Sequence, residues 1–264
     1  MELGIRDRRA LVTGSTAGIG FATARMLAGE GADVIVNGRT AERVERAIAL
    51  IREDFPSASL TAVPADLGTA AGCALMLERI PSLDILVNNL GIFEPKPFEE
   101  IPDEDWLRFF EVNVLSGVRL TRHYLPRMRL RKWGRIVFVS SESAVQIPAE
   151  MIHYGMTKTA QVAIARGVAE TVAGTGVTVN SVLAGPTASE GVSEFVEQLA
   201  RQRGVDFASM EREFFATARP SSLLQRFARP DEVASAIVYL CSEQASATTG
   251  AAVRADGGVV RAIL

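Results

Sequence analysis

Lysine, histidine and cysteine are all scarce in this chain of 264 residues. The 28 basic residues include only three lysines, Lys96, Lys132 and Lys158, so a lysine in a patterned position stands out. The 31 acidic residues nearly balance the basic ones and leave a net charge of −3. That balance excludes the basic surface expected of a protein that binds nucleic acid.

The two cysteines, Cys73 and Cys241, lie far apart and match no metal-binding or redox spacing, which excludes a disulfide framework. We expect two buried, reduced thiols and no bound metal. The first residues contain no apolar run typical of a signal peptide. The longest uncharged stretch, 171–189, contains glycines and a proline that would break a membrane-spanning helix. We therefore expect a cytoplasmic protein that does not bind membranes.

Short apolar runs alternate with longer amphipathic segments along the whole chain. Apolar runs without strict alternation are typical of parallel strands covered on both faces. Their alternation with helical segments predicts a Rossmann-type, doubly wound α/β fold in a single domain, 1–264. The predicted strands are 10–13, 33–37, 60–63, 84–88, 135–140, 177–183 and 251–255. The clearest predicted helices are 21–30, 42–55, 103–131 and 154–173.

One segment, 186–230, departs from this rhythm. Its pattern predicts two helices, 191–203 and 207–218, where one crossover helix would suffice, and it is rich in phenylalanine. Long insertions in compact α/β enzymes tend to form lids or binding loops. Because this one leaves the sheet at the carboxyl end of a strand, where such folds bind ligands, we favour a lid. The alternative is a surface subdomain with its own small core.

The first predicted strand is followed directly by a glycine-rich turn and then by a helix. Glycines at such a turn permit a sharp bend, close approach of a pyrophosphate and tight packing of the helix on the strand. The helix N-terminus offers free N–H groups to phosphate. This order predicts a dinucleotide site. Its candidate residues are Gly14, Ser15, Gly18, Ile19 and Gly20.

The end of the second predicted strand indicates which dinucleotide binds. A carboxylate there would bind a free ribose 2′-hydroxyl, but the chain has Arg39 and Thr40 instead. The forked guanidinium of Arg39 matches the oxygens of a 2′-phosphate. We therefore favour NADP, with NAD as the alternative. An exposed arginine at a helix start would give the same sequence.

A tyrosine and one of the rare lysines lie one helical turn apart. Tyr154 and Lys158 begin a predicted helix, so both side chains project from the same face. A phenol is a poor base at neutral pH, but a neighbouring ammonium favours its ionised form. Such a pair can exchange a proton with an alcohol or carbonyl oxygen. Ser141, just past the strand 135–140, could hold the same oxygen, although Ser140 and Ser143 compete with it.

These features together resemble the short-chain dehydrogenase/reductase family, from residue 9 to about residue 258. The family implies hydride transfer between a nicotinamide cofactor and a carbonyl or secondary alcohol. Further motifs occur in the family's order and spacing. They are Asp66 with Leu67; Asn88, Asn89, Leu90 and Gly91; Asn113; Ser141; Asn180 with Gly185; and Asp256, Gly257 and Gly258.

The resemblance implies a role for each matching residue. Tyr154 would be the general acid/base, Lys158 would lower its pKa and bind the nicotinamide ribose, and Ser141 would polarise the substrate carbonyl. Asn113 would hold the water of a proton relay behind Lys158, unless it merely caps or kinks its helix. The implied cofactor contacts are Asp66 to the adenine, Asn89 to its ribose, Thr187 and Ser189 to the carboxamide, and Leu67, Gly91 and Gly185 elsewhere along the cofactor.

Three positions depart from the family pattern. Leu90 replaces a small residue, and Ala184 replaces the proline that usually precedes Gly185, which removes a restraint on φ. Ala17 replaces the basic residue that many NADP-binding members carry, so a 2′-phosphate would depend largely on Arg39. These departures weaken the prediction of NADP over NAD. They do not affect the four predicted catalytic residues, Asn113, Ser141, Tyr154 and Lys158.

The sequence defines the substrate and partners less closely. Phe93, Met151 and the insertion favour a medium-sized or hydrophobic ketone, although the same residues could belong to the core. The alternatives are a 3-oxoacyl-[acyl-carrier-protein] reductase-like enzyme and a non-catalytic NADP-binding sensor. The helices 103–131 and 154–173 resemble those through which family members form dimers and tetramers, so we expect a homo-oligomer. A basic cluster could dock an acidic carrier protein; it comprises Arg119, Arg122, His123, Arg127, Arg129, Arg131, Lys132 and Arg135.

Overall fold

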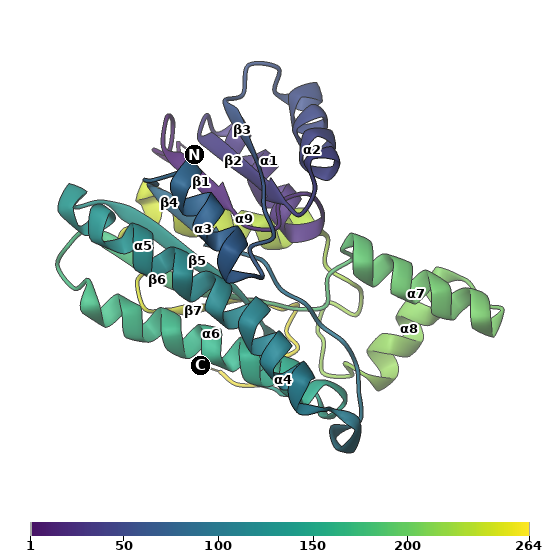
Figure 1. The fold of residues 1–264 in the computed structure, drawn as a ribbon. Coiled ribbons are helices and arrows are strands. Elements are labelled where there is room, and N and C mark those ends of the chain that lie inside the picture. The colour runs from purple at the N-terminus through teal and green to yellow at the C-terminus, as the bar shows by residue number, and fades with distance from the viewer. Residues whose placement is uncertain (1, 264) are drawn as a thin grey trace.

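A parallel sheet of seven strands forms the centre of the molecule (Figure 1). The computed structural model describes residues 2–263, except for the side chains of 193–195 and 198–199. The strand order is β3-β2-β1-β4-β5-β6-β7. The strands are β1 (Arg9–Val12), β2 (Asp33–Gly38), β3 (Leu60–Pro64), β4 (Ile85–Asn88), β5 (Gly134–Ser141), β6 (Val177–Ala184) and β7 (Ala252–Ala255). Each predicted strand is present, and the doubly wound α/β fold is confirmed.

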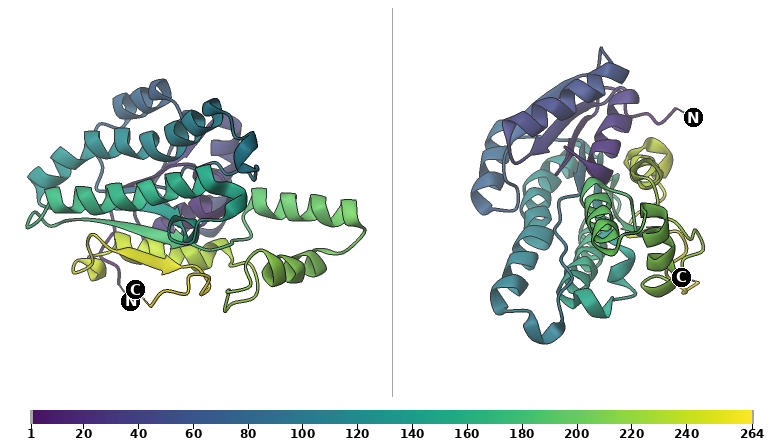
Figure 2. Two further views of the ribbon diagram at one scale, coloured as in Figure 1. Left: turned by 90° about the horizontal axis from the view of Figure 1, so that it is seen from below. Right: turned by 90° about the vertical axis from the view of Figure 1, so that its right-hand side faces the viewer.

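Helices cover both faces of the sheet (Figure 2). On one face lie α1 (Gly18–Gly29), α2 (Ala41–Asp54) and α9 (Pro230–Cys241); on the other lie α3 (Ala70–Arg79), α5 (Ser116–Arg131) and α6 (Ile152–Thr171). In β1, Ala10 and Val12 pack into the first layer, whereas Leu11 packs into the second. Because both faces are covered, strands such as β1 are apolar throughout. None of the helices in the described part of the chain is long and apolar enough to cross a membrane.

The strand order places the carboxyl ends of β1 and β4 side by side. The chain winds outward from β1 through β2 to β3, and then returns to β4 on the other side of β1. The loops after β1 and β4 therefore diverge, and ligands of such sheets bind in the crevice between them. The glycine-rich turn follows β1, so the topology places it at this crevice.

The segment predicted as one helix over 103–131 consists of three parts. It contains α4 (Asp103–Phe110), a π-helical turn, η2 (Glu111–Leu115), and α5. Such wide turns interrupt α-helices mainly at functional sites. Here the carbonyl of Asn113 accepts a hydrogen bond of 2.6 Å from Gln161 Nε2 on α6. The predicted bounds of 103–131 are confirmed, whereas the π-helical turn within them was not predicted, because periodicity does not reveal a bond to a neighbouring helix.

Residues 186–230 carry two helices that project from the body of the molecule (Figures 1 and 2). The helices are α7 (Glu190–Arg203) and α8 (Phe207–Thr217), close to the predicted bounds. A β-bridge between Thr187 and Ala228 closes the base of the segment. The segment has a small core of its own, formed by Val196, Ala200, Met210, Phe215 and Phe227.

His153, on α6, is fully buried among aromatic rings of α4. Its ring centroid lies 4.1 Å from that of Phe109 and 6.0 Å from that of Trp106. Among the described residues, neither ring nitrogen has a hydrogen-bond partner. Burial lowers the pKa of His153, more strongly than the nearby carboxylates raise it. The side chain thus belongs to the packing of α6 on α4.

We expect His153 to make the protein sensitive to acid. Because folding favours its neutral form, its contribution to stability is complete above the ordinary histidine pKa of about 6.5 and is lost as the pH falls below that value. In His153→Leu, the melting temperature should therefore fall less between about pH 7 and pH 5.5 than in the parent. Thermal melts across this range measure the effect. His123→Leu, at the only other histidine, is the control, and an equal fall in both variants would contradict the assignment.

Candidate active site

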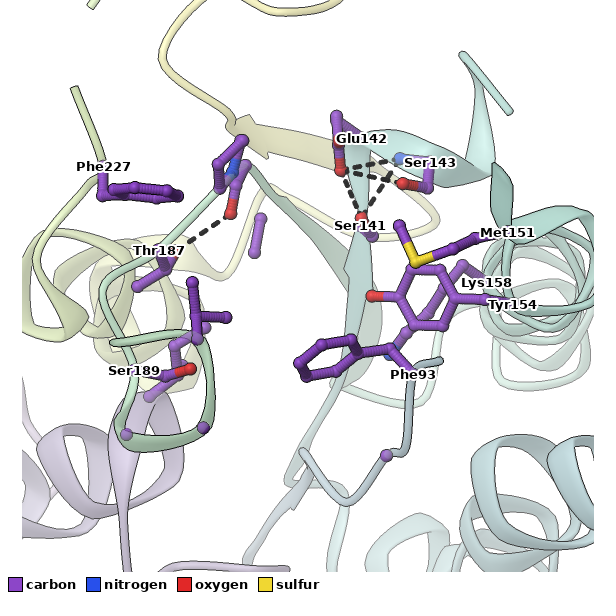
Figure 3. A pocket seen from close by; sticks show the side chains of 18 of the residues that line it. Phe93, Ser141, Glu142, Ser143, Met151, Tyr154, Lys158, Thr187, Ser189 and Phe227 are labelled. Atoms are coloured by element: carbon purple, nitrogen blue, oxygen red, sulfur yellow. Dashed lines mark hydrogen bonds between the residues drawn. The ribbon is translucent and has the colours of Figure 1, made fainter. Parts of the chain in front are cut away.

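A cavity of about 580 Å³ lies at the carboxyl ends of β1, β4, β5 and β6 (Figure 3). The glycine-rich turn forms one part of its wall, and Tyr154 with Ser141 forms another. The insertion lines it as well, through Met210 and Phe214 on α8. The predicted site residues in its wall are Gly18, Ile19, Gly20, Asn89, Gly91, Ser141, Tyr154, Lys158, Gly185, Thr187 and Ser189.

The glycine-rich turn needs its glycines for two separate reasons. Gly14 and Gly18 have φ values of +62° and +56°, a left-handed conformation that favours glycine. At Gly20, a Cβ atom would lie 2.3 Å from the carbonyl oxygen of Gly14, which leaves no room for a side chain. The N-cap of α1, Ala17, offers no side-chain acceptor, so the first N–H groups of the helix are available to a ligand.

Two side-chain amides hold this turn in place. The Asn89 side chain donates to the carbonyl oxygens of Thr13 and Gly14 at 2.9 and 3.2 Å. Asn37, at the end of β2, accepts from Gly14 N through its side chain at 3.1 Å and from Ser15 N through its carbonyl at 2.8 Å. Asn89 therefore stabilises the turn, whatever contact it makes with a ligand. Asn37 stabilises it as well, although it belongs to none of the sequence motifs.

Tyr154 and Lys158 project from the first turns of α6 as predicted. The Tyr154 hydroxyl points into the cavity, and its ring packs edge-on against Phe93 at 6.4 Å between centroids (Figure 3). The Lys158 ammonium lies 5.6 Å from the centre of the Tyr154 ring and donates to the carbonyl oxygen of Val139 at 2.9 Å. Lys158 is only 4% exposed.

Both groups have shifted pKa values. Desolvation raises the pKa of Tyr154, and the charge of Glu142 raises it further, whereas Ser141 and Arg219 lower it. Desolvation lowers the pKa of Lys158 to about 8, against the opposing effect of Glu142. The amine is thus close to its titration range at neutral pH, and the phenol is protonated. This arrangement suits proton exchange with an oxygen in the cavity.

Ser141 ends β5 beside Tyr154. Its hydroxyl donates to Glu142 Oε2 and accepts from Ser143 N at 3.1 Å. Ser140 instead donates to the carbonyl oxygen of Lys158 at 2.8 Å, which ties β5 to α6. Of the three serines that could hold the substrate oxygen, Ser140 is therefore occupied by a structural hydrogen bond. Ser141 and Ser143 both line the cavity.

Comparison with known proteins agrees with this geometry. A family model described as Enoyl-(Acyl carrier protein) reductase matches residues 14–260. The uncharacterized oxidoreductase YvaG of Bacillus subtilis is 48% identical, with 100% of both chains covered. D-beta-hydroxybutyrate dehydrogenase of Cupriavidus necator is 34% identical, with 97% of this chain and 99% of the relative covered. The crystal structure of L-sorbose reductase from Gluconobacter frateurii, complexed with NADPH and L-sorbose, has a TM-score of 0.93 at 31% identity and 100% coverage of both chains.

The chain belongs to the short-chain dehydrogenase/reductase family. It is an oxidoreductase that acts on CH–OH groups, and the resemblance recognised in the sequence is confirmed. The predicted roles of individual residues remain predictions, because family membership does not test them residue by residue.

Some of this dehydrogenase/reductase's predicted cofactor residues lie farther along the same edge of the sheet. Arg39 and Thr40 follow β2 and are exposed, and Thr40 also caps α2 by accepting from the backbone of Arg43. Asp66 and Leu67 follow β3; Asp66 is exposed and accepts from the backbone of Gly68, whereas Leu67 is buried. These residues flank the turn on the side where the adenosine half of a dinucleotide would extend.

Arg43 makes a contact that the sequence did not reveal. Its guanidinium donates to Glu190 at 2.9 Å and joins α2 to the first residue of α7. Because Ser189 also lies against Gly18, the start of the insertion borders the glycine-rich turn directly. The two partners are about half exposed, so the pair adds little stability by itself.

Asn113 is fully committed to the packing of this dehydrogenase/reductase. Its side chain accepts from Ile92 N at 2.7 Å and donates to Ile92 O and to Thr157, both at 3.0 Å. Its carbonyl accepts from Gln161, whose Oε1 in turn accepts from the Lys158 ammonium at 3.2 Å. The Gln161 amide thus bridges the two groups that the family resemblance would connect through a water.

The basic cluster is less available than the sequence predicted. Arg135 is 1% exposed and donates to the carbonyl oxygens of Ser242, Gly134 and Gly176. Arg119 pairs with Glu111 at 2.7 Å. The prediction that Arg135 forms part of a docking surface is wrong, because the side chain is buried and its guanidinium donates to backbone carbonyls instead.

Gln161 should raise the pKa of Lys158 by accepting a hydrogen bond from the ammonium, against the effect of desolvation. In Gln161→Leu, the ammonium loses an acceptor in a buried site, so its neutral form gains and its pKa should fall by about one unit from about 8. NMR titration of protein labelled at its lysines measures this, because only three signals are expected. Gln202→Leu, on the exposed face of α7, is the control; an unchanged Lys158 titration in Gln161→Leu would refute the bridge.

Proposed function

We propose that this enzyme uses NADPH to reduce the carbonyl of a medium-sized, largely apolar ketone, or catalyses the reverse oxidation of the corresponding alcohol. The observation that carries the proposal is the shared cavity. The phosphate-binding turn and the Tyr154–Lys158 pair line one space, so a dinucleotide on the turn could extend to the tyrosine hydroxyl.

The residues at the turn fit such a cofactor. The left-handed glycines and the excluded Cβ at Gly20 leave the backbone open to a pyrophosphate. The uncapped N-terminus of α1 complements its negative charge. We assign Gly14 to Gly20 to the pyrophosphate, Asp66, Leu67, Asn89 and Gly91 to the adenosine side, and Gly185, Thr187 and Ser189 to the nicotinamide side. NADPH, when bound, supplies the hydride.

Side chains of the protein would transfer the proton to the substrate oxygen. Tyr154 donates its phenolic proton to the carbonyl oxygen as that oxygen becomes an alkoxide, and it recovers the proton afterwards. The Lys158 ammonium favours the phenolate left behind. Ser141 would add a second hydrogen bond to the same oxygen by turning its proton from Glu142 to the substrate, and donors aimed at a developing oxyanion stabilise the transition state. Asn113 acts by fixing the loop at Ile92 and, through Gln161, the position of Lys158.

The proposal of NADP over NAD depends on Arg39. Arg39 is exposed at the end of β2, where the 2′-substituent of the adenine ribose would lie. At the end of this strand the chain has Gly38, Arg39 and Thr40 and no carboxylate. The solved structure of L-sorbose reductase holds NADPH, which supports the same choice here.

Arg39→Ala should weaken NADPH binding by about tenfold or more, because a charge-assisted hydrogen bond to phosphate is lost, and leave NADH binding unchanged. Fluorescence titration with each nucleotide measures both affinities. Arg52→Ala, at the far end of α2, serves as the control. Equal NADPH affinity in Arg39→Ala and the parent would refute the assignment.

The substrate end of the cavity is mainly apolar. Phe93 and Met151 flank Tyr154, and Met210, Phe214 and Phe227 approach from the insertion. We propose that 186–230 acts as a lid over this end. Apolar surface of this kind favours ketones with an aliphatic or aromatic chain.

A 3-oxoacyl thioester is the second candidate substrate, because the 3-oxoacyl-[acyl-carrier-protein] reductase FabG of Aquifex aeolicus is 30% identical over 98% of this chain. The sensor alternative has little support, since Ser141, Tyr154 and Lys158 all meet in the cavity. We also propose a homo-oligomer that forms through the segment 103–131. Leu107 and Phe110 lie one turn apart on α4 and are 71% and 38% exposed, and adjacent apolar side chains of this kind suit an interface.

Tyr154→Phe should lower kcat by a factor of about 100 to 10,000, because the general acid is removed. NADPH binding should be retained. NADPH oxidation with a panel of aliphatic and aromatic ketones, 3-oxoacyl thioesters and ketoses measures the loss and ranks the substrates. Tyr239→Phe, an exposed tyrosine on α9, is the matched control. Turnover retained in Tyr154→Phe would overturn the mechanism.

A further inference from the structure

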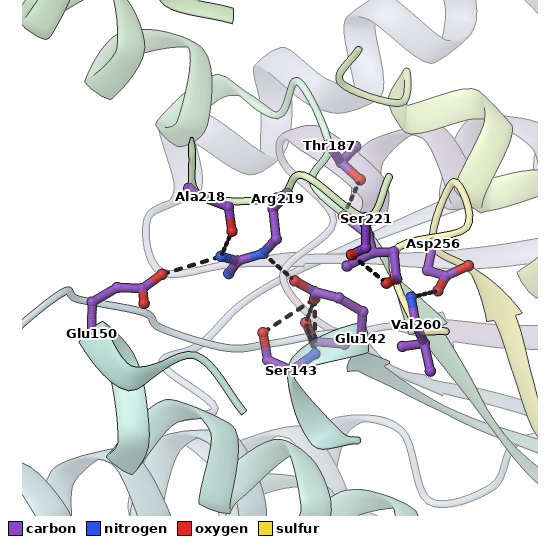
Figure 4. A network of polar contacts seen from close by, with 12 residues as sticks. Glu142, Ser143, Glu150, Thr187, Ala218, Arg219, Ser221, Asp256 and Val260 are labelled. Carbon is purple, nitrogen blue, oxygen red and sulfur yellow. Dashed lines mark hydrogen bonds and ion pairs between the residues drawn. The ribbon is translucent and has the colours of Figure 1, made fainter. Parts of the chain in front are cut away.

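A buried ion pair joins the insertion to the residue that follows Ser141 (Figure 4). Arg219 Nε donates to Glu142 Oε1 at 2.9 Å, and the two side chains are 10% and 5% exposed. Both side chains also line the cavity. Glu142 lies at the end of β5, whereas Arg219 follows α8, so the pair connects two parts of the chain that are 77 residues apart.

The other oxygen of Glu142 is occupied by serines. Oε2 accepts from the Ser141 hydroxyl, from Ser143 N at 2.9 Å and from Ser143 Oγ at 3.1 Å. The Ser141 proton therefore faces Glu142, and Ser143 N occupies one lone pair of Ser141. Ser141 also lies beside the Tyr154 hydroxyl, and a hydrogen bond from Ser141 to the phenolate oxygen lowers the pKa of Tyr154. Glu142 thus fixes the orientation of the hydroxyl beside the proposed general acid.

Arg219 is itself held firmly. It donates to Glu150 at 3.2 Å and to the carbonyl oxygen of Ala218 at 2.8 Å. The loop that follows it is fixed to the C-terminal segment, because Leu223 N and Leu224 N both donate to Gly257 O. Because Arg219 comes directly after the C-cap of α8, a shift of α8 would change the distance between the Arg219 guanidinium and the Glu142 carboxylate.

We propose that Glu142 is a positioning residue that orients the Ser141 hydroxyl, and that Arg219 shields Tyr154 from the charge of Glu142 whenever the insertion is in place. This inference rests on the proposed role of Tyr154 as general acid. It makes the insertion an electrostatic part of the reacting centre as well as a wall of the cavity.

The charges around Tyr154 support opposite effects of the two partners. Glu142 raises the pKa of Tyr154, whereas Arg219 lowers it. The other charged groups that face this region belong to α6, to η4 (Ala149–Met151) and to the loop that carries Phe93. They are Lys158, Glu150 bound to Arg219, and Lys96, which pairs with Glu94 and Asp105.

The test is the pH profile of carbonyl reduction. Reduction needs the protonated phenol, so kcat falls as the pH rises through the pKa of Tyr154. Arg219→Met leaves the Glu142 charge unshielded and should move this basic limb upward by about one pH unit. Glu142→Gln removes the charge and should move the limb downward by a similar amount. In the double variant the two shifts should cancel.

Two further variants separate this effect from damage to the fold. Arg219→Lys keeps the charge and should return the limb toward that of the parent. Arg203→Met removes another ion pair of the insertion, between α7 and Glu213 on α8, and should leave the profile unchanged. Shifts in the same direction for Arg219→Met and Glu142→Gln, or no shift in either, would overturn the proposal.

A second measurement does not depend on turnover. Glu142 also raises the pKa of Lys158, so Glu142→Gln should lower that pKa below about 8 in an NMR titration of the lysines. An unchanged Lys158 titration would show that the charge of Glu142 does not act on this pair. If the parent protein reduced no carbonyl compound, the proposed function would fail, whereas the titration would still decide whether Glu142 acts here.

Discussion

The burial of the Lys158 ammonium is the constraint on which the rest of the site depends. Removing such a cation from water costs several kcal/mol unless other groups replace its hydration. The replacement comes from the Val139 carbonyl of β5, the Gln161 amide of α6 and the ring of Tyr154. All three must keep their positions for the amine to remain near its titration range. The chemistry of the pair is therefore set by the packing of α6 on β5, which the Ser140 bond to the backbone of Lys158 reinforces.

The same constraint explains the irregular helix between β4 and β5. The Gln161 side-chain oxygen accepts from the Lys158 ammonium, and the buried side-chain N–H of Gln161 then needs an acceptor of its own. The Asn113 carbonyl in the π-helical turn is that acceptor. Within a regular α-helix, that carbonyl would be engaged along the helix axis. The side chain of Asn113 then holds the loop that carries Phe93 through its bonds to Ile92. One widened turn thus orients both the lysine and the aromatic wall next to Tyr154.

Much of the fold and part of the site could be predicted from the sequence, because those features are local. The strand bounds follow from short apolar runs, and the spacing of Tyr154 and Lys158 fixes their common face. Four residues could not be predicted, because each depends on at least one partner far away in the chain: Asn37, Gln161, Glu142 and Arg219. The 77 residues between Arg219 and Glu142 are one example. The side chain of Arg135 looked like surface charge for the same reason, since the buried carbonyls that it serves come from Gly176 and Ser242.

The two ends of the cavity are held by different kinds of interaction. At the cofactor end, Asn89 and Asn37 fix the glycine-rich turn through hydrogen bonds to the backbone that also join neighbouring strands. At the substrate end, the insertion has a separate small core and meets the sheet through a β-bridge and a buried ion pair. A substitution in that core can therefore reshape the apolar wall without disturbing the turn. However, because Arg219 lies beside Glu142, a change in the insertion's position would also alter the charge near Tyr154. Substrate fit and proton transfer are physically coupled in this arrangement, and the Arg43–Glu190 pair and the contact of Ser189 with Gly18 also connect the start of the insertion to the glycine-rich turn.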